Sequence, residues 1–84
     1  MTWGVRYTPG AERQLDALER TLRRRIQNAL ARLALDPHAS PNVTALQGGG
    51  YRLRVGDWRV LYTLRGDMLL IVVLKIAHRR EAYR

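Results

Sequence analysis

The residues of this chain with the clearest chemical potential are arginines that alternate with apolar residues in its C-terminal half. Arg52 and Arg54 lie two positions apart, so they share one face of an extended strand. Arg59 follows a Gly-Asp pair and would lie opposite Arg54 across a two-residue turn. Like charges directly opposite each other cost stability, which a protein tolerates when an anion binds between them. The guanidinium fork binds phosphate through two hydrogen bonds, so the pattern favours a polyanion; a solvated face of arginines is the alternative.

The other side chains restrict the chemistry that these arginines can support. His38 and His78 are far apart in the sequence and no acidic pair accompanies either, so no metal site and no cofactor are predicted. Ser40, the only serine, lies beside Pro41, which argues against a catalytic triad. The reaction that remains is metal-free RNA cleavage, in which the ribose 2′-OH attacks the adjacent phosphate and cations stabilise the dianionic transition state.

Proton transfer must come from another group, because an arginine pKa above about 12 keeps the guanidinium protonated. The candidate carriers near the basic face are His78, Glu81 and Tyr83. Histidine is a common proton carrier near neutral pH, yet a single histidine after a strand is more often structural. Tyr83 is able to stack on a base or to orient the 2′-OH, or else it docks the C-terminal tail.

The overall charge supports the same class of partner. The 84 residues carry 15 Lys and Arg against 7 Asp and Glu, a net charge of +8, and Lys75 is the only lysine. A strongly basic chain fits nucleic acid, an anionic membrane or an acidic protein, although an arginine-rich proteome also explains the preference for arginine over lysine. The absence of cysteine excludes disulfides and cysteine metal sites. No N-terminal signal is expected, and the apolar run Met68–Ala77 is too short to span a bilayer, so we expect a cytoplasmic protein of one domain, residues 1–84, with no membrane partner.

Hydrophobic spacing predicts the elements that position the arginines. Trp3–Tyr7 alternate as a half-buried strand. Thr8 is placed to cap a helix that starts at Pro9 and runs to about residue 19, and a second helix spans Thr21–Leu35. The segment His38–Gly50 is expected to be a polar loop.

The next two strands are expected to form a tight hairpin. A two-residue turn at Gly56-Asp57 places Val55 opposite Trp58 and Arg54 opposite Arg59. The core face of the hairpin then carries Tyr51, Leu53, Val55, Trp58, Val60 and Tyr62.

The last strand completes the predicted fold. Met68–Ala77 is almost continuously aliphatic, which fits a central strand covered on both faces. A two-residue turn at Gly66-Asp67 would place Lys75 on the Trp58 side, and a loop one residue longer, which the charge pattern favours, would place it on the arginine face. The fold class is therefore α+β: an N-terminal strand, a helical hairpin and a three-stranded antiparallel meander, with the helices packed on one face of the sheet.

The sequence resembles the RelE/ParE superfamily of bacterial toxins, on its RelE side. The likeness rests on YRLRVGDWRVLY at 51–62, on the aliphatic strand and on IAHRREAY at 76–83, and it extends over nearly the whole chain. It implies the toxin of a type II toxin–antitoxin pair with a RelE-like fold. Because RelE-type toxins cut mRNA in the ribosomal A site, the implied function is a ribosome-dependent mRNA endonuclease that inhibits translation.

The resemblance also implies site residues. Carried over by position, the catalytic set is Arg52, Arg54, Arg59, Arg79 and Tyr83. His78 and Arg80 are expected to contact the substrate, and Arg80 is the alternative to Arg79 as the functional C-terminal arginine. Well-known members of the family have lysines at the positions of Arg52 and Arg54, and a lysine is assigned the proton-accepting role there. The identity of the base in this chain therefore stays open.

Two further functions fit the same fold. One is a ParE-like inhibitor of DNA gyrase, which does not need the arginine and tyrosine set; the other is an RNA- or ribosome-binding module that has lost catalysis. Either toxin function implies an acidic, partly disordered antitoxin that wraps the toxin and folds on binding, and through which operator DNA is bound. The helices at about 11–19 and 21–35 are the predicted docking surfaces.

Overall fold

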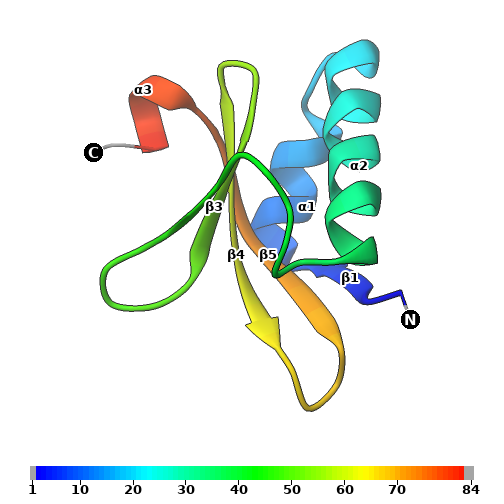
Figure 1. The fold of residues 1–84 in the computed structure, drawn as a ribbon. Helices are drawn as coiled ribbons and strands as arrows, with labels where there is room; N and C mark the ends of the chain where they lie inside the picture. The colour runs from blue at the N-terminus through cyan, green and yellow to red at the C-terminus, as the bar shows by residue number, and fades with distance from the viewer. Residues whose placement is uncertain (1, 83–84) are drawn as a thin grey trace.

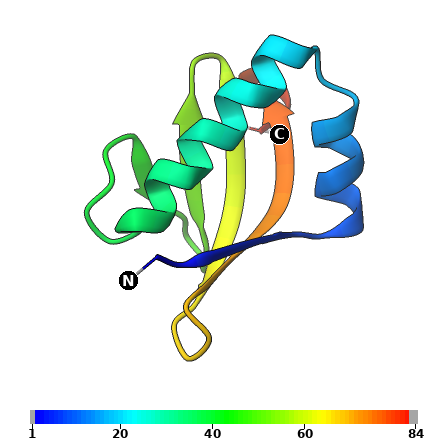
Figure 2. The same cartoon turned by 90° about the vertical axis from the view of Figure 1, so that its right-hand side faces the viewer.

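The computed structural model describes residues 2–82 and has the predicted α+β fold (Figure 1). The elements are β1 Gly4–Tyr7, α1 Pro9–Asp16, α2 Arg20–Leu35, β2 Val43–Ala45, β3 Tyr51–Val55, β4 Trp58–Arg65, β5 Leu70–His78 and α3 Arg79–Ala82. The strands form one sheet in the order β1-β5-β4-β3-β2, and α1 and α2 cover one face of it (Figure 2). Within residues 2–82, none of the helices is long and apolar enough to cross a membrane.

Both long helices form close to where the sequence predicts. The hydroxyl of Thr8 accepts a hydrogen bond from the backbone N–H of Ala11 at 3.2 Å, and Pro9 occupies the first turn, where its missing N–H is not needed. Glu19 caps α2 by accepting from the N–H of Thr21. The residues that both helices bury against the sheet are spaced mostly three or four apart: Ala11, Leu15, Ile26, Leu30, Leu33 and Ala34.

The register of the β3–β4 hairpin confirms the prediction. Val55 pairs with Trp58, and Arg54 pairs with Arg59. The core face of the hairpin packs under the helices, through the buried side chains of Leu53, Val55, Val60 and Tyr62. Since neighbouring residues of a strand point to opposite faces, Arg54 and Arg59 lie on the face of the sheet away from α1 and α2.

The prediction of a loop throughout His38–Gly50 is wrong in part. Its Val43–Ala45 segment forms β2, an edge strand antiparallel to β3. Valine and threonine are β-branched and favour a pleated sheet. Asn42, with a φ of 66°, precedes the strand and accepts a hydrogen bond from the backbone N–H of Arg54 at 2.9 Å. The segment is therefore fixed beside the arginines of β3.

The prediction that the last strand is covered on both faces is also wrong. Ile71, Val73 and Ile76 are buried, but Leu74 is 45% exposed and Lys75 is exposed as well. The reason is that α1 and α2 both pack on the same side of the sheet (Figure 1).

Lys75 lies on the arginine face, as predicted, but a shift in the strand register places it there and not the length of the loop. It pairs with Leu61, which on its other side pairs with Arg52. The loop between β4 and β5 spans residues 66–69, and this length alone would place Lys75 on the opposite face. An irregularity of the ladder between Leu61 and Tyr62 shifts the register by one residue and returns Lys75 to the arginine face.

Candidate active site

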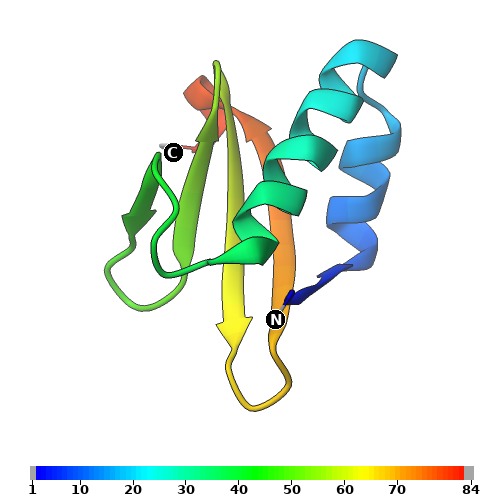
Figure 3. The same cartoon turned by 45° about the vertical axis from the view of Figure 1, so that its right-hand side comes forward.

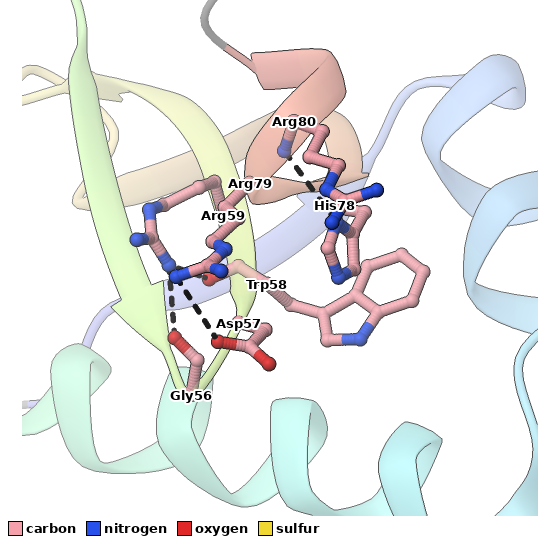
Figure 4. A network of polar contacts seen from close by, with 7 residues as sticks. All are labelled: Gly56, Asp57, Trp58, Arg59, His78, Arg79 and Arg80. Carbon is pink, nitrogen blue, oxygen red and sulfur yellow. Dashed lines mark hydrogen bonds and ion pairs between the residues drawn. The ribbon is translucent and has the colours of Figure 1, made fainter.

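The β3–β4 turn is the structural centre of the candidate site. Gly56 has a φ of +60°, which fits a two-residue turn that takes glycine at its first central position. Arg59 is only 8% exposed, and its Nη1 donates to the backbone oxygens of Gly56 at 2.9 Å and of Trp58 at 3.0 Å (Figure 4). A buried guanidinium needs acceptors, and these carbonyls provide them. Arg59 therefore shapes the turn as well as contributing charge.

The same turn holds the start of α3. The backbone N–H of Arg79 donates to the carbonyl oxygen of Asp57 at 2.7 Å. The Arg79 Nη1 atom also lies 3.9 Å from the Asp57 carboxylate, and both side chains are more than half exposed. Arg79 and Arg59 are far apart in the sequence, and the pairing of β4 with β5 brings them to one end of the sheet.

Arg54 completes the group on the β3 side. It lies directly opposite Arg59, and its Nη2 donates to the side-chain oxygen of Asn42 at 3.3 Å. The cost of two opposed arginines is thus reduced by neutral acceptors on both sides, because Arg59 is bonded to carbonyls and Arg54 to an amide oxygen.

A groove of about 610 Å³ lies between α2 and this end of the hairpin. It passes around the end of the hairpin, since its lining includes Leu53 and Val55 from the helix face of β3 as well as Arg54 from the opposite face. Its lining includes five arginines: Arg25, Arg32, Arg54, Arg59 and Arg79. Among the described residues that line it, Asp57 is the only carboxylate. A second hollow of about 300 Å³ adjoins it, since Asn42, Arg54 and Arg59 line both, and the second hollow adds Arg52. The arrangement is suited to an anion with several charges.

The structure brings together only part of the predicted set. Arg52, Arg54, Arg59 and Arg79 line the two hollows, whereas Arg80 lines neither. Tyr83, the predicted catalytic tyrosine, lies outside the described residues.

The expectation that His78 lies near the basic face is wrong. His78 pairs with Trp58, and their rings meet edge to face with centroids 5.6 Å apart. Its Nδ1 accepts the backbone N–H of Arg80 at 3.4 Å. Figure 4 shows His78 and Trp58 together, on the other side of the strand from Arg59. The parity of the strand explains this placement, because residues that pair with Trp58 share its face.

Several residues of the groove were not predicted from the sequence. Arg25 and Arg32 come from α2, and Asn42 and Asp57 come from turns. Arg25 and Arg32 are seven positions apart, which places them on one face of a helix, so the spacing carried a signal. Nothing in the sequence indicated that this face looks toward the β3–β4 turn.

Within residues 2–82 there is no cluster of three or more His, Cys, Asp or Glu side chains that could hold a metal ion. Among the described residues, the largest pKa change belongs to Tyr62, which lies on the helix side of the sheet. Burial, with a smaller contribution from the stacked Tyr51, raises the pKa of Tyr62 to about 12. This tyrosine is 1% exposed, so it cannot reach a substrate.

Comparison with known proteins places these features in a family. The sequence model described as ParE toxin of type II toxin-antitoxin system, parDE, matches residues 5–83. The chain belongs to this toxin family. The resemblance to the RelE/ParE superfamily is thereby confirmed. A search among curated protein sequences finds no match.

Solved structures share the fold of this toxin. A chain of the toxin–antitoxin complex RelBE2 from Mycobacterium tuberculosis has a TM-score of 0.83 at 24% identity, covering 94% of this chain and 93% of that one. A chain of the archaeal RelE–RelB complex from Pyrococcus horikoshii has a TM-score of 0.77 at 26% identity, covering 94% and 97%. The YoeB/ParE toxin from Agrobacterium tumefaciens has a TM-score of 0.77 at 17% identity, covering 89% and 96%.

Proposed function

We propose that this toxin is a ribosome-dependent endonuclease that cuts mRNA in the ribosomal A site and so inhibits translation. The observation that carries the proposal is the convergence of Arg54, Arg59 and Arg79 on one groove at the β3–β4 turn. Phosphoryl transfer without a metal needs fixed cations at the phosphate, and arginine provides them as a rigid fork.

The proposed step is a transesterification. The 2′-oxygen forms a bond to the adjacent phosphorus while the bond from phosphorus to the 5′-oxygen breaks, leaving a 2′,3′-cyclic phosphate and a 5′-hydroxyl. The 2′-OH loses a proton and the leaving oxygen gains one. Arg54, Arg59 and Arg79 would stabilise the additional negative charge on the phosphate oxygens. Since arginine does not accept protons, the base is Tyr83, the ribosome or a group that the ribosome orders.

The partners follow from the family. The RelE–RelB and RelBE2 structures are complexes of a toxin with its antitoxin. We propose that this toxin likewise binds an antitoxin in the cytoplasm, where ribosomes and mRNA are present. A net charge of +8 favours an acidic antitoxin segment, and operator DNA would then be bound through the antitoxin.

Primer extension on mRNA from a translation extract tests the proposed activity. Added toxin should arrest translation and produce cuts within the A-site codon, with the cyclic phosphate at the new 3′ end. An mRNA with 2′-deoxyribose at the attacking nucleotide is the matched control and should remain intact, because the nucleophile is absent. Ribosome association with intact mRNA would instead indicate the RNA-binding module without catalysis.

Inhibition of DNA gyrase is the second candidate, and the match to the ParE toxin family favours it. Induction of the toxin would then cause filamentation and an SOS response before translation stops. Gyrase supercoiling in the presence of purified toxin is the direct measurement. Inhibition of supercoiling together with intact mRNA would replace the endonuclease with the gyrase inhibitor.

A further inference from the structure

The wall of the groove opposite the sheet belongs to α2. Arg25, Ala29 and Arg32 line it, at a spacing of four and then three residues, so they form one face of the helix. Both arginines are exposed, and the small side chain of Ala29 between them leaves room. Of the arginines that the sequence motif predicts for catalysis, Arg54, Arg59 and Arg79 lie on the other wall, and Arg52 lines the adjoining hollow.

Arg25 extends across to the β3–β4 turn. A β-carbon built on Gly56 would lie 3.1 Å from Nη1, 3.2 Å from Nη2 and 3.3 Å from Cζ of Arg25. The guanidinium therefore rests directly on the backbone of the turn that carries Arg59 and Asp57. The absence of a side chain at Gly56 permits this contact, so one end of the α2 wall meets the candidate catalytic arginines.

Arginines line both walls of the groove and the hollow beside it. Arg54 and Arg59 line both the groove and the adjoining hollow, so a basic surface runs from Arg32 and Arg25 past these two residues to Arg52. Arg25 and Arg32 are seven residues apart on a helix, or about 10.5 Å along its axis. This separation favours a different phosphate for each arginine over one phosphate shared by both. The surface fits a chain of separate anions, each meeting its own arginine.

We infer that Arg25 and Arg32 form a second phosphate-binding wall, which holds nucleotides of single-stranded RNA next to the one bound at Arg54, Arg59 and Arg79. The choice of RNA as the ligand rests on the proposed function. The continuity with the sheet arginines supports it, and so does the composition of the lining, where five arginines face a single carboxylate among the described residues. Arginine also stacks on bases, which a single strand leaves accessible.

Two charge-matched double variants of the full-length toxin test the inference. Arg25→Gln with Arg32→Gln removes the α2 wall, and Arg20→Gln with Arg24→Gln removes two exposed arginines of the same helix that line neither hollow. The probe is a fluorescent single-stranded RNA of about 12 nucleotides, titrated by anisotropy between about 50 and 200 mM KCl, a range over which phosphate contacts change affinity strongly. Circular dichroism of each variant verifies the fold.

The wall variant should bind the RNA about tenfold more weakly at about 50 mM KCl, and the slope of log K against log salt should fall by about 1.4, or about 0.7 for each phosphate that is no longer neutralised. The helix control should change affinity less than about threefold and keep the slope. Equal losses in the two variants would overturn the inference, because net charge alone would then explain binding. Absence of RNA binding by the unmodified toxin would overturn it too.

An oligoglutamate peptide of the same charge distinguishes the other class of ligand. If the wall variant loses affinity for this peptide and not for RNA, the wall binds an acidic protein segment and the inference is wrong. Because the assay needs neither ribosomes nor cleavage, its outcome is independent of the proposed function. If RNA binding depends on Arg25 and Arg32 but the toxin makes no A-site cuts, the proposed endonuclease activity is wrong and the inferred phosphate-binding wall stands.

Discussion

The dipeptide Gly-Asp occurs twice in this chain, at Gly56-Asp57 and Gly66-Asp67, and the two copies form turns at opposite ends of the sheet (Figure 3). The first is a two-residue turn held by a buried arginine and covered by Arg25. The second belongs to a four-residue loop, residues 66–69, where a β-carbon on Gly66 would meet nothing within 4 Å. An arginine accompanies each turn, but Arg65 is 56% exposed and forms a surface ion pair with Asp67.

The Gly-Asp dipeptide therefore predicts a turn, but it does not predict whether that turn contributes to a binding site. The Gly56-Asp57 turn becomes part of the groove because three other segments line the groove with it: α2 through Arg25, the loop before β2 through Asn42, and α3 through Arg79. The Gly66-Asp67 turn projects away from the helices, with Met68 62% exposed at its tip.

Replacing the arginine of each turn should produce the largest difference in stability. Arg59→Gln should lower the free energy of unfolding by about 3 kcal/mol, because two carbonyl acceptors lose a charged donor in a buried site. Arg65→Gln should change it by less than about 0.5 kcal/mol, since the ion pair is exposed. Urea unfolding of both variants measures the difference, and equal values would show that the two turns are held alike.

Ionisation of Tyr62, which lies in β4 between the two turns, should lower the free energy of unfolding. The hydroxyl is buried and has no hydrogen-bond partner among the described residues. Its folded pKa of about 12 exceeds the usual 10, so the contribution to stability is complete below pH 10 and is lost as the pH rises from 10 to 12. The loss should reach about 2 kcal/mol at pH 12, where half of the folded protein keeps the proton, and its limit at higher pH is about 2.8 kcal/mol, from roughly 1.4 kcal/mol for each of the two pKa units.

Tyr62→Phe is the control, because it removes the group that ionises. Relative to this variant, the native protein should lose stability between pH 10 and about 12, and near neutral pH the variant should be equal to it or more stable. A parallel pH dependence of the two proteins would contradict the assignment.

The two glycines should also respond differently to a methyl group. Gly56→Ala imposes the left-handed region on a residue with a β-carbon and displaces Arg25, so it should cost about 1–2 kcal/mol. Gly66 has no neighbour in the way, and Gly66→Ala should stay within about 0.5 kcal/mol. Thermal unfolding compares the pair, and a larger loss at Gly66 would contradict the difference between the turns.

The smallest effect is expected from the two aspartates. Asp57 is the only carboxylate among the described residues that line the groove, and it repels a bound phosphate. Asp57→Asn should therefore raise affinity for the same short RNA, by about twofold, because an exposed charge pair contributes at most about 1 kcal/mol. Asp67→Asn carries the same change of charge at the other turn and should leave affinity unchanged. An equal gain in both variants would indicate only the change in net charge.

Much of the fold was predictable because local signals agreed with one another. Thr8 and Pro9 mark a helix start, and the alternation around Gly56 sets the hairpin register, which is correct at Arg54 and Arg59. The strand β2 was missed because three residues give too short a pattern in a segment rich in glycine and proline. The irregularity beside Tyr62 was missed because no single residue marks it.

The site was predictable only in part, for a geometric reason. Residue type indicated which groups bind anions, and strand parity placed Arg54 and Arg59 correctly. The pairing of β5 with β4 places His78 opposite Trp58, on the face away from the arginines. That pairing depends on the length of the loop between the two strands, which the sequence left open. The contribution of Arg25 depends on how α2 crosses the sheet, a tertiary property that spacing does not reveal.

Cleavage of mRNA on programmed ribosomes by Arg79→Gln and Arg65→Gln tests the central claim most directly. Both side chains are exposed, and both variants remove one positive charge. Arg79→Gln should cut about 100-fold more slowly in a single turnover, as expected when one donor to a transition-state charge is removed, and Arg65→Gln should remain within about twofold of the native rate. Equal rates for the two variants would contradict the claim that the Gly56-Asp57 turn assembles the active site.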